Sequence, residues 1–163
     1  VPAANLIGEE GAGFRQVFHG LNPERITGAA VCVGIARYAL AQAARYANDR
    51  TVWETPIGAH QGVSHPLAKA AIETELAALM TRKAAWCHDH GLPAGEASNM
   101  AKYAAAEAAL NALDAAIQTH GGNGLAREYG LLPYWGMLRI APVNREMILN
   151  FVAQHTLGLP KSY

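Results

Sequence analysis

AKYAAAEAALNALDAAIQTHGGNG, residues Ala101–Gly124, joins a long alanine-rich segment to a run of glycines. Alanine is the strongest helix former and lets helices approach closely, so this segment predicts a central, tightly packed helix that ends near Thr119. Glycines adopt positive φ readily, and Gly121, Gly122 and Gly124 predict a sharp end to the helix. The glycines alone are explained by a left-handed helix stop, or by a backbone that another molecule approaches.

Helical periodicity extends over most of the remaining chain. Apolar residues recur at helical spacing over residues 14–48 and 63–90, and the alanine-rich helix is expected over 95–119. A fourth helix is expected over 133–157, with Pro142 as a candidate break. No segment alternates with period two for long enough to predict a strand. Long helices with short connections predict an all-α fold, an up-down four-helix bundle.

Composition narrows the classes of function. The 163 residues fit one domain with a substantial core, and the formal net charge of zero gives no support to a nucleic-acid partner. No apolar run approaches the ~20 residues that a membrane span needs. Cys32 and Cys87 lie far apart without metal-like spacing, which favours a reducing compartment. No signal peptide opens the chain, so we expect a cytoplasmic location and a segment taken from a longer polypeptide.

His88 and His90, on either side of Asp89, are a candidate pair of metal ligands. Residues two apart on a helix point to different faces, so these two side chains could not easily share an ion. Solvated histidines at a helix end explain the pair better, and no metal site is expected.

A second informative stretch is the connection between the first two expected helices. Arg50, Trp53 and Gln61 place a cation, an aromatic ring and an amide on this loop. A guanidinium binds phosphate oxygens well because its planar fork matches their geometry. Taken alone, Arg50 is better explained as a solvated charge at a helix end, and Trp53 as a core aromatic.

The ordered set of these motifs resembles the carboxy-terminal helical domain of the acyl-CoA dehydrogenase family over nearly the whole chain. Arg50, Trp53 and Gln61 are similar to its Arg-x-x-Phe-Gly…Gln signature, with Glu54 in place of the glycine. Further matches are the segment over residues 5–14, which is similar to the passage into the first bundle helix, Gln118, and the glycine run Gly121-Gly122-Asn123-Gly124.

The resemblance implies a domain division and a cofactor. Residues 1–13 would end a β-domain and link it to the bundle, which would comprise residues 14–163. The cofactor would be FAD, in a site shared between protomers. Arg50 would pair with its pyrophosphate and Trp53 would pack near its adenine. The remaining residues that the resemblance assigns to the cofactor are Gln61, Gln118, Gly121, Gly122 and Asn144.

The resemblance also implies a reaction and partners. The reaction would be α,β-dehydrogenation of an acyl-CoA thioester, with an electron-transferring flavoprotein as acceptor. The protein would be a homo-oligomer, dimer or tetramer, or would pair with a paralogous subunit. Related flavin oxidases and monooxygenases share the fold, and a non-catalytic oligomerisation subunit is a further alternative. The bundle alone is expected to bind FAD poorly and to be inactive.

The catalytic base is where this sequence departs from the commoner family pattern. Most members carry a glutamate in Tyr-Glu-Gly-Thr before the final helix, and the corresponding residues here are Ala141-Pro142-Val143-Asn144. Glu24 instead lies in a segment, residues 21–25, that is similar to the Leu-Asp-x-Glu-Arg base segment of isovaleryl-CoA and long-chain acyl-CoA dehydrogenases, with Asn22 in place of the aspartate. A partly buried glutamate suits removal of an α-proton. We therefore expect Glu24 to be the base, rather than a partner of Arg25, and Arg25 to hold the helix or to bind the CoA arm of the substrate.

Overall fold

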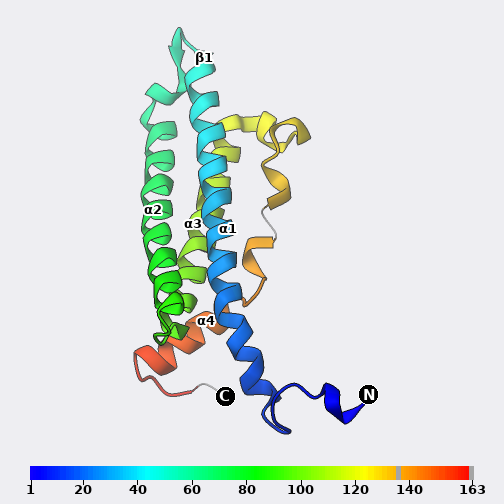
Figure 1. Cartoon of the computed structure of the whole chain (residues 1–163). Helices are drawn as coiled ribbons and strands as arrows, with labels where there is room; N and C mark the ends of the chain where they lie inside the picture. Colours follow the sequence, from blue (N-terminus) through cyan, green and yellow to red (C-terminus); the bar gives the residue numbers. More distant parts are fainter. Residues whose placement is uncertain (135–136, 162–163) are drawn as a thin grey trace.

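The computed structural model describes residues 1–134 and 137–161. Within this part of the chain there are four α-helices, and the last continues into a π-helical turn. Figure 1 shows α1, α2 and α3 side by side with alternating chain direction, and α4 across one end of them. The predicted all-α fold with four helices is confirmed. The bounds are α1 Gly13–Asp49, α2 Gln61–Asp89, α3 Gly95–His120, α4 Arg145–Phe151 and the π-helical turn Val152–Thr156.

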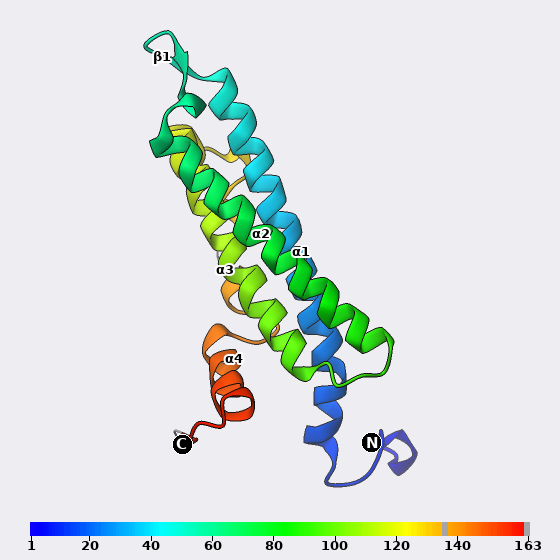
Figure 2. The same ribbon diagram turned by 90° about the vertical axis from the view of Figure 1, so that its left-hand side faces the viewer.

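Alanines supply most of the core between the three long helices. Their small side chains allow the helix backbones to approach closely, and α3 packs against both α1 and α2. The predicted central position of α3 is therefore confirmed by its packing against both other long helices. Figure 2 shows the three long helices running side by side. Fully buried alanines include Ala29, Ala36, Ala39 and Ala43 of α1, Ala84 of α2, and Ala101, Ala105, Ala109, Ala112 and Ala116 of α3.

A small antiparallel hairpin connects α1 to α2. Its strands are β1, Thr51–Val52, and β2, Thr55–Pro56, followed by a 3-10 turn, Ile57–Ala59. Trp53 and Glu54 form the two-residue loop with φ values of 49° and 65°. Positive φ at both central residues is the geometry of a type I′ turn, whose twist matches that of the flanking strands. The sequence pattern predicted a loop here and missed these two short strands.

After α3 the chain returns along α1 in a series of short 3-10 turns rather than as a long helix (Figure 1). The expectation of a helix from residue 133 onward is wrong, because α4 begins only at Arg145. Pro142 lacks the N–H that a helix interior requires, and the helix starts just after it. The turns are Gly121–Leu125, Arg127–Tyr129, Leu132–Tyr134 and Met137–Arg139, and one further turn, Ala3–Asn5, precedes α1.

Asn144 and Ile148 fix the position of α4. The side-chain Oδ1 of Asn144 accepts a hydrogen bond from the backbone N–H of Met147 at 3.0 Å, which caps the helix. Ile148 is buried, and α4 packs on α3 near the start of that helix. The last helix is therefore a short cap across the bundle end.

Among the described residues, α1 is the one helix long and apolar enough to match the length and hydropathy of a membrane span. Its apolar composition has a role within the fold. One face of α1 carries buried residues from Ala29 to Ala47 that pack against α2 and α3.

Candidate functional sites at the two ends of the first helix

Four of the predicted site residues meet in one cavity where α1 and α3 end. This space, the Arg50 cavity, has a volume of about 460 Å³. The structure thus brings together Arg50, Gln118, Gly121 and Gly122, which come from distant parts of the sequence. The complete lining is Tyr46, Arg50, Ile57, Gln118, Thr119, His120, Gly121, Gly122 and Asn123.

Arg50 is held at the carboxy-terminal cap of α1 by its own backbone. Its N–H donates to the carbonyl of Tyr46 at 2.9 Å, and its carbonyl accepts from the N–H of Ile57 at 2.8 Å. These two bonds join the end of α1 to the turn after the hairpin. The guanidinium is exposed, and no carboxylate of the described residues lies within ion-pair distance of it. Its charge is therefore available to an anionic ligand.

The glycine turn presents open backbone to the same cavity. Gly121 ends α3 with a φ of 58°, and its N–H donates to the carbonyl of Gln118. A Cβ placed at Gly121 or Gly122 would meet no atom within 4 Å. Gly124 differs, because a Cβ there would lie 2.6 Å from the backbone carbonyl oxygen of Ile117. The turn is closed on the side of α3 and open on the side of the cavity.

The other residues assigned to the cofactor lie outside the Arg50 cavity. Trp53 is 85% exposed at the hairpin tip, with its ring 6.3 Å from that of His60. Gln61 is exposed at the first position of α2. Asn144 caps α4 at the opposite end of the bundle. This single chain does not bring these three side chains together with Arg50.

Glu24 lies beside a second, mainly apolar cavity of about 500 Å³, the Glu24 cavity. Its wall joins one face of α1 to the segment that precedes α4. Glu24 itself is exposed in this chain, whereas a partly buried carboxylate was expected. Burial raises the pKa of the Cys32 thiol in the same wall. The lining is Pro23, Glu24, Thr27, Gly28, Val31, Cys32, Leu138, Ala141 and Pro142.

Arg25 points the other way, into the protein. It is 5% exposed, one Nη atom donates to the Oδ1 of Asn22 at 3.0 Å, and its Nε has no hydrogen-bond partner. Burial lowers the pKa of this guanidinium. Glu24 and Arg25 form no ion pair within the described part of the chain, so the carboxylate is not held by its neighbour.

Lys102 supports the wall of the Glu24 cavity from behind. This lysine is 2% exposed, and its Nζ donates to the backbone carbonyl of Leu138 at 3.0 Å. Burial lowers the pKa of Lys102. Leu138 lines the Glu24 cavity, so the hydrogen bond joins α3 to that wall.

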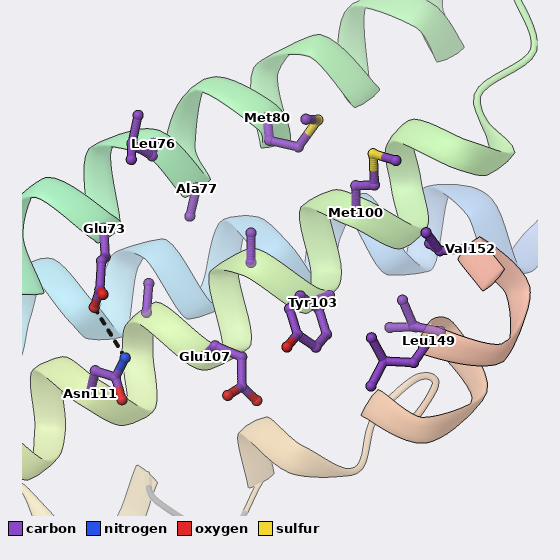
Figure 3. A pocket seen from close by; sticks show the side chains of 13 residues that line it. Glu73, Leu76, Ala77, Met80, Met100, Tyr103, Glu107, Asn111, Leu149 and Val152 are labelled. Atoms are coloured by element: carbon purple, nitrogen blue, oxygen red, sulfur yellow. Dashed lines mark hydrogen bonds between the residues drawn. The ribbon is translucent and has the colours of Figure 1, made fainter. Parts of the chain in front are cut away.

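A third cavity, of about 660 Å³, lies between α2, α3 and α4 (Figure 3). Its walls are apolar, with Leu76, Met80 and Leu149 among the lining side chains. The Nδ2 of Asn111 donates to a carboxylate oxygen of Glu73 at 3.0 Å, the dashed line in Figure 3. None of the predicted site residues lines this cavity.

Sequence reasoning missed the aromatic residues around the glycine turn. Tyr46, His120 and Tyr129 surround Asn123, and Tyr46 is 77 positions from it in sequence. The signal that could have found Tyr46 is its position one helical turn before Arg50. Among the described residues no group of three metal-ligating side chains gathers, and His90 stacks on Trp86.

Comparison with known proteins places this architecture in a family. A family model described as "Acyl-CoA dehydrogenase, C-terminal domain" matches residues 11–153. Acyl-CoA dehydrogenase FadE12 of Mycobacterium tuberculosis is 58% identical over 168 aligned positions, which cover 100% of this chain and 43% of that protein. The chain thus spans less than half the length of this relative.

Solved structures give the same result. Butyryl-CoA dehydrogenase from Megasphaera elsdenii superposes with a TM-score of 0.92 at 32% identity, covering 96% of this chain and 42% of that one. A structure of PigA with FAD and proline superposes with a TM-score of 0.92 at 29% identity, covering 98% and 42%. The resemblance seen in the motifs is confirmed, and the chain belongs to the acyl-CoA dehydrogenase family, as its carboxy-terminal helical domain.

Proposed function

We propose that this chain is the carboxy-terminal domain of an FAD-dependent acyl-CoA dehydrogenase that catalyses α,β-dehydrogenation of an acyl-CoA thioester. The observation that carries the proposal is the convergence of Arg50, Gln118, Gly121 and Gly122 on one cavity, with Glu24 beside another. In this division of the chain, residues 1–13 end the β-domain and link it to the bundle of residues 14–163.

The Arg50 cavity fits the pyrophosphate portion of FAD. The guanidinium has no carboxylate partner among the described residues, so its charge can pair with phosphate oxygens. The open backbone at Gly121 and Gly122 lets a ligand lie against the turn without meeting a side chain. Gln118 adds a side-chain amide beside the turn. Trp53 and Gln61 would contact the more distant parts of the cofactor, and Asn144 would contact a second FAD.

The distance between the two cavities supports an FAD site shared between protomers. Arg50 follows Glu24 by about 26 positions on α1, or about 39 Å at 1.5 Å per helical residue. One FAD held at Arg50 cannot also place its reactive ring beside Glu24 of the same chain. We therefore propose that Arg50 serves the FAD of a neighbouring protomer, in a homo-oligomer or with a paralogous subunit.

Glu24 is the proposed base. Its carboxylate removes the α-proton of the thioester, and FAD, when bound, supplies the acceptor for the β-hydride. The apolar walls formed by Val31, Leu138 and Pro142 suit an acyl chain and exclude water from the reacting carbon once substrate is bound. Arg25 supports the helix that carries Glu24, because it is buried and bonded to Asn22. Its alternative role, contact with the CoA arm of the substrate, would require the side chain to turn outward.

The remaining parts of the proposal concern the surroundings of the enzyme. Electrons pass from the reduced cofactor to an electron-transferring flavoprotein, and the protein is cytoplasmic. Both parts of the proposal rest on the family to which the chain belongs. This isolated domain, which holds only one part of each shared site, should bind FAD weakly and lack activity.

The test uses the full-length protein, purified and mixed anaerobically with a panel of acyl-CoA thioesters while the oxidised-flavin absorbance is followed. Bleaching by one class of thioester supports dehydrogenation and names the substrate. Bound flavin that no thioester bleaches would indicate a missing partner subunit or a different flavin chemistry, such as that of a monooxygenase. Fast reoxidation of the bleached flavin by oxygen would identify a related flavin oxidase. Protein without flavin, found by native mass spectrometry in a complex with a flavin-binding paralogue, would identify a non-catalytic subunit.

A further inference from the structure

Asn123 is tied to two tyrosines from different parts of the fold. Its Nδ2 donates to the hydroxyl of Tyr46 at 3.1 Å and to the hydroxyl of Tyr129 at 3.2 Å. Tyr46 lies in the last turns of α1, and Tyr129 lies in the 3-10 turn after the glycines. An amide nitrogen has two protons, so both tyrosine contacts can form at once. Asn123 therefore joins the glycine turn to α1.

The rings around this contact are packed closely enough to hold it. His120 is 4% exposed and stacks on Tyr46 with ring centroids 4.3 Å apart. Tyr129 meets His120 edge-on at 5.1 Å and Tyr46 edge-on at 6.0 Å. His120 Nδ1 lies 2.7 Å from the carbonyl oxygen of Ala116, which fixes the imidazole on the last turn of α3. Three segments thus meet in one aromatic cluster.

The aromatic cluster joins the two parts of the Arg50 cavity that face the proposed pyrophosphate, namely Arg50 and the glycine turn. Tyr46 precedes Arg50 by one helical turn, and its backbone carbonyl accepts a hydrogen bond from the backbone N–H of Arg50. Asn123 directly follows Gly122, and both residues line the cavity with Tyr46. A contact between Tyr46 and Asn123 therefore sets the separation between the guanidinium and the open glycine backbone.

We propose that Asn123, Tyr46 and Tyr129 are positioning residues for cofactor binding. They hold the glycine turn at a fixed separation from Arg50, and they act on the cofactor through these two groups. This inference rests on the proposed FAD site. Preorganised binding groups lose less entropy when the ligand binds, so loosening the turn lowers affinity even when every contacting group remains.

The experiment compares Tyr46→Phe, Tyr129→Phe and Asn123→Ala in the full-length protein. Phenylalanine keeps the ring packing and removes only the hydroxyl. Tyr103→Phe is the matched control, because Tyr103 is a partly buried tyrosine far from the Arg50 cavity. The FAD dissociation constant is measured by titration of the apoprotein. Amide hydrogen exchange of Gly121, Gly122 and Asn123 is measured without FAD.

We expect each tyrosine variant to weaken FAD binding about threefold to tenfold, the effect of one lost hydrogen bond. Adding Tyr46→Phe to Asn123→Ala should then cause no further loss, because both changes remove the same contact. The turn amides should exchange faster in Tyr46→Phe but not in Tyr103→Phe.

The inference would be overturned if both Tyr46→Phe and Tyr129→Phe kept the wild-type affinity for FAD and the wild-type amide exchange of the turn. This outcome does not depend on whether Asn123→Ala folds. Additive losses in the double variant would also overturn it. Failure of the proposed FAD site is distinguishable, because the wild-type protein would then bind no FAD, and a bound flavin that no thioester bleaches would leave the affinity comparison intact. The exchange measurement would still show whether the tyrosines order the turn.

Discussion

Glu24 and Pro142 line the same cavity, although one lies early in α1 and the other just before α4. Pro142 packs against α1 one helical turn beyond Glu24, since a Cβ added at Gly28 would lie 3.2 Å from the Cδ of Pro142. The resemblance to the family placed its commoner base at position 142 and the rarer one at position 24. The structure shows that these two positions border one space, so a carboxylate at either can face the same substrate.

The shared cavity predicts that the base can be relocated. In the full-length protein, Glu24→Gln should slow flavin reduction by about 10²–10⁴-fold, the usual contribution of a general base. Adding Pro142→Glu should restore the rate at least about tenfold, because the new carboxylate borders the same cavity. Pro142→Gln in the same background is the control, and it should restore nothing. Equal rates for the two double variants would show that position 142 does not reach the reacting carbon.

The hairpin loop predicts a stabilising substitution. Glu54 has a φ of 65°, a conformation that costs a residue with a Cβ about 1–2 kcal/mol. Glycine relieves this cost but loses more chain entropy on folding, so Glu54→Gly should stabilise the hairpin by about 0.5–1 kcal/mol. Glu54→Ala removes the same carboxylate without relieving the backbone and should give no gain. Amide exchange across the hairpin measures both, and a gain in the alanine variant would refute the explanation.

The two sides of the glycine turn predict opposite phenotypes. Gly124→Ala should destabilise the protein by about 1–3 kcal/mol, because its Cβ would lie 2.6 Å from the carbonyl oxygen of Ile117. Gly122→Ala meets no neighbour within 4 Å and should leave the unfolding temperature close to that of the wild type. It should weaken FAD binding instead, by filling the space in front of the turn. Thermal unfolding and FAD titration separate the two, and a stable Gly124→Ala protein would contradict the packing.

The buried Lys102 predicts a particular dependence of stability on pH. Burial lowers its folded-state pKa below the ordinary value of 10.5, so between these two values the unfolded chain binds more protons. The contribution of Lys102 to the free energy of unfolding must therefore rise with pH across that interval. Lys102→Met should lack this rise. The free energy of unfolding of the wild type minus that of the variant should therefore increase toward alkaline pH. Lys83→Met, which removes an exposed lysine, is the control. A difference that stays constant with pH would contradict the assignment.

The three long helices could be predicted from the sequence because their apolar and alanine positions recur with helical period. The fourth could not be bounded, since a proline in an apolar segment fits both a kinked helix and a series of turns. Only the packing of Ile148 and the cap at Asn144 show where α4 begins. The hairpin was missed because each strand is too short to show alternation.

The site shows a similar division. Arg50, Gln118 and the glycines could be found as motifs, and the fold brings them to one cavity. The contact between Asn123 and Tyr46 could not be predicted from the sequence, because it depends on how far α1 extends beside α3. The exposure of Glu24 also could not be predicted, since a motif does not show how deep its side chain lies in the fold.

The most direct test of the account is the rate of anaerobic flavin reduction in full-length Glu24→Gln, measured by stopped flow with the best acyl-CoA substrate. Glutamine keeps the size of the side chain and removes its basicity, and FAD content and thioester affinity are measured alongside. The account predicts wild-type FAD content, nearly unchanged substrate binding, and a reduction rate lower by about two to four orders of magnitude. Reduction at the wild-type rate would contradict it, because another group would then have to remove the α-proton.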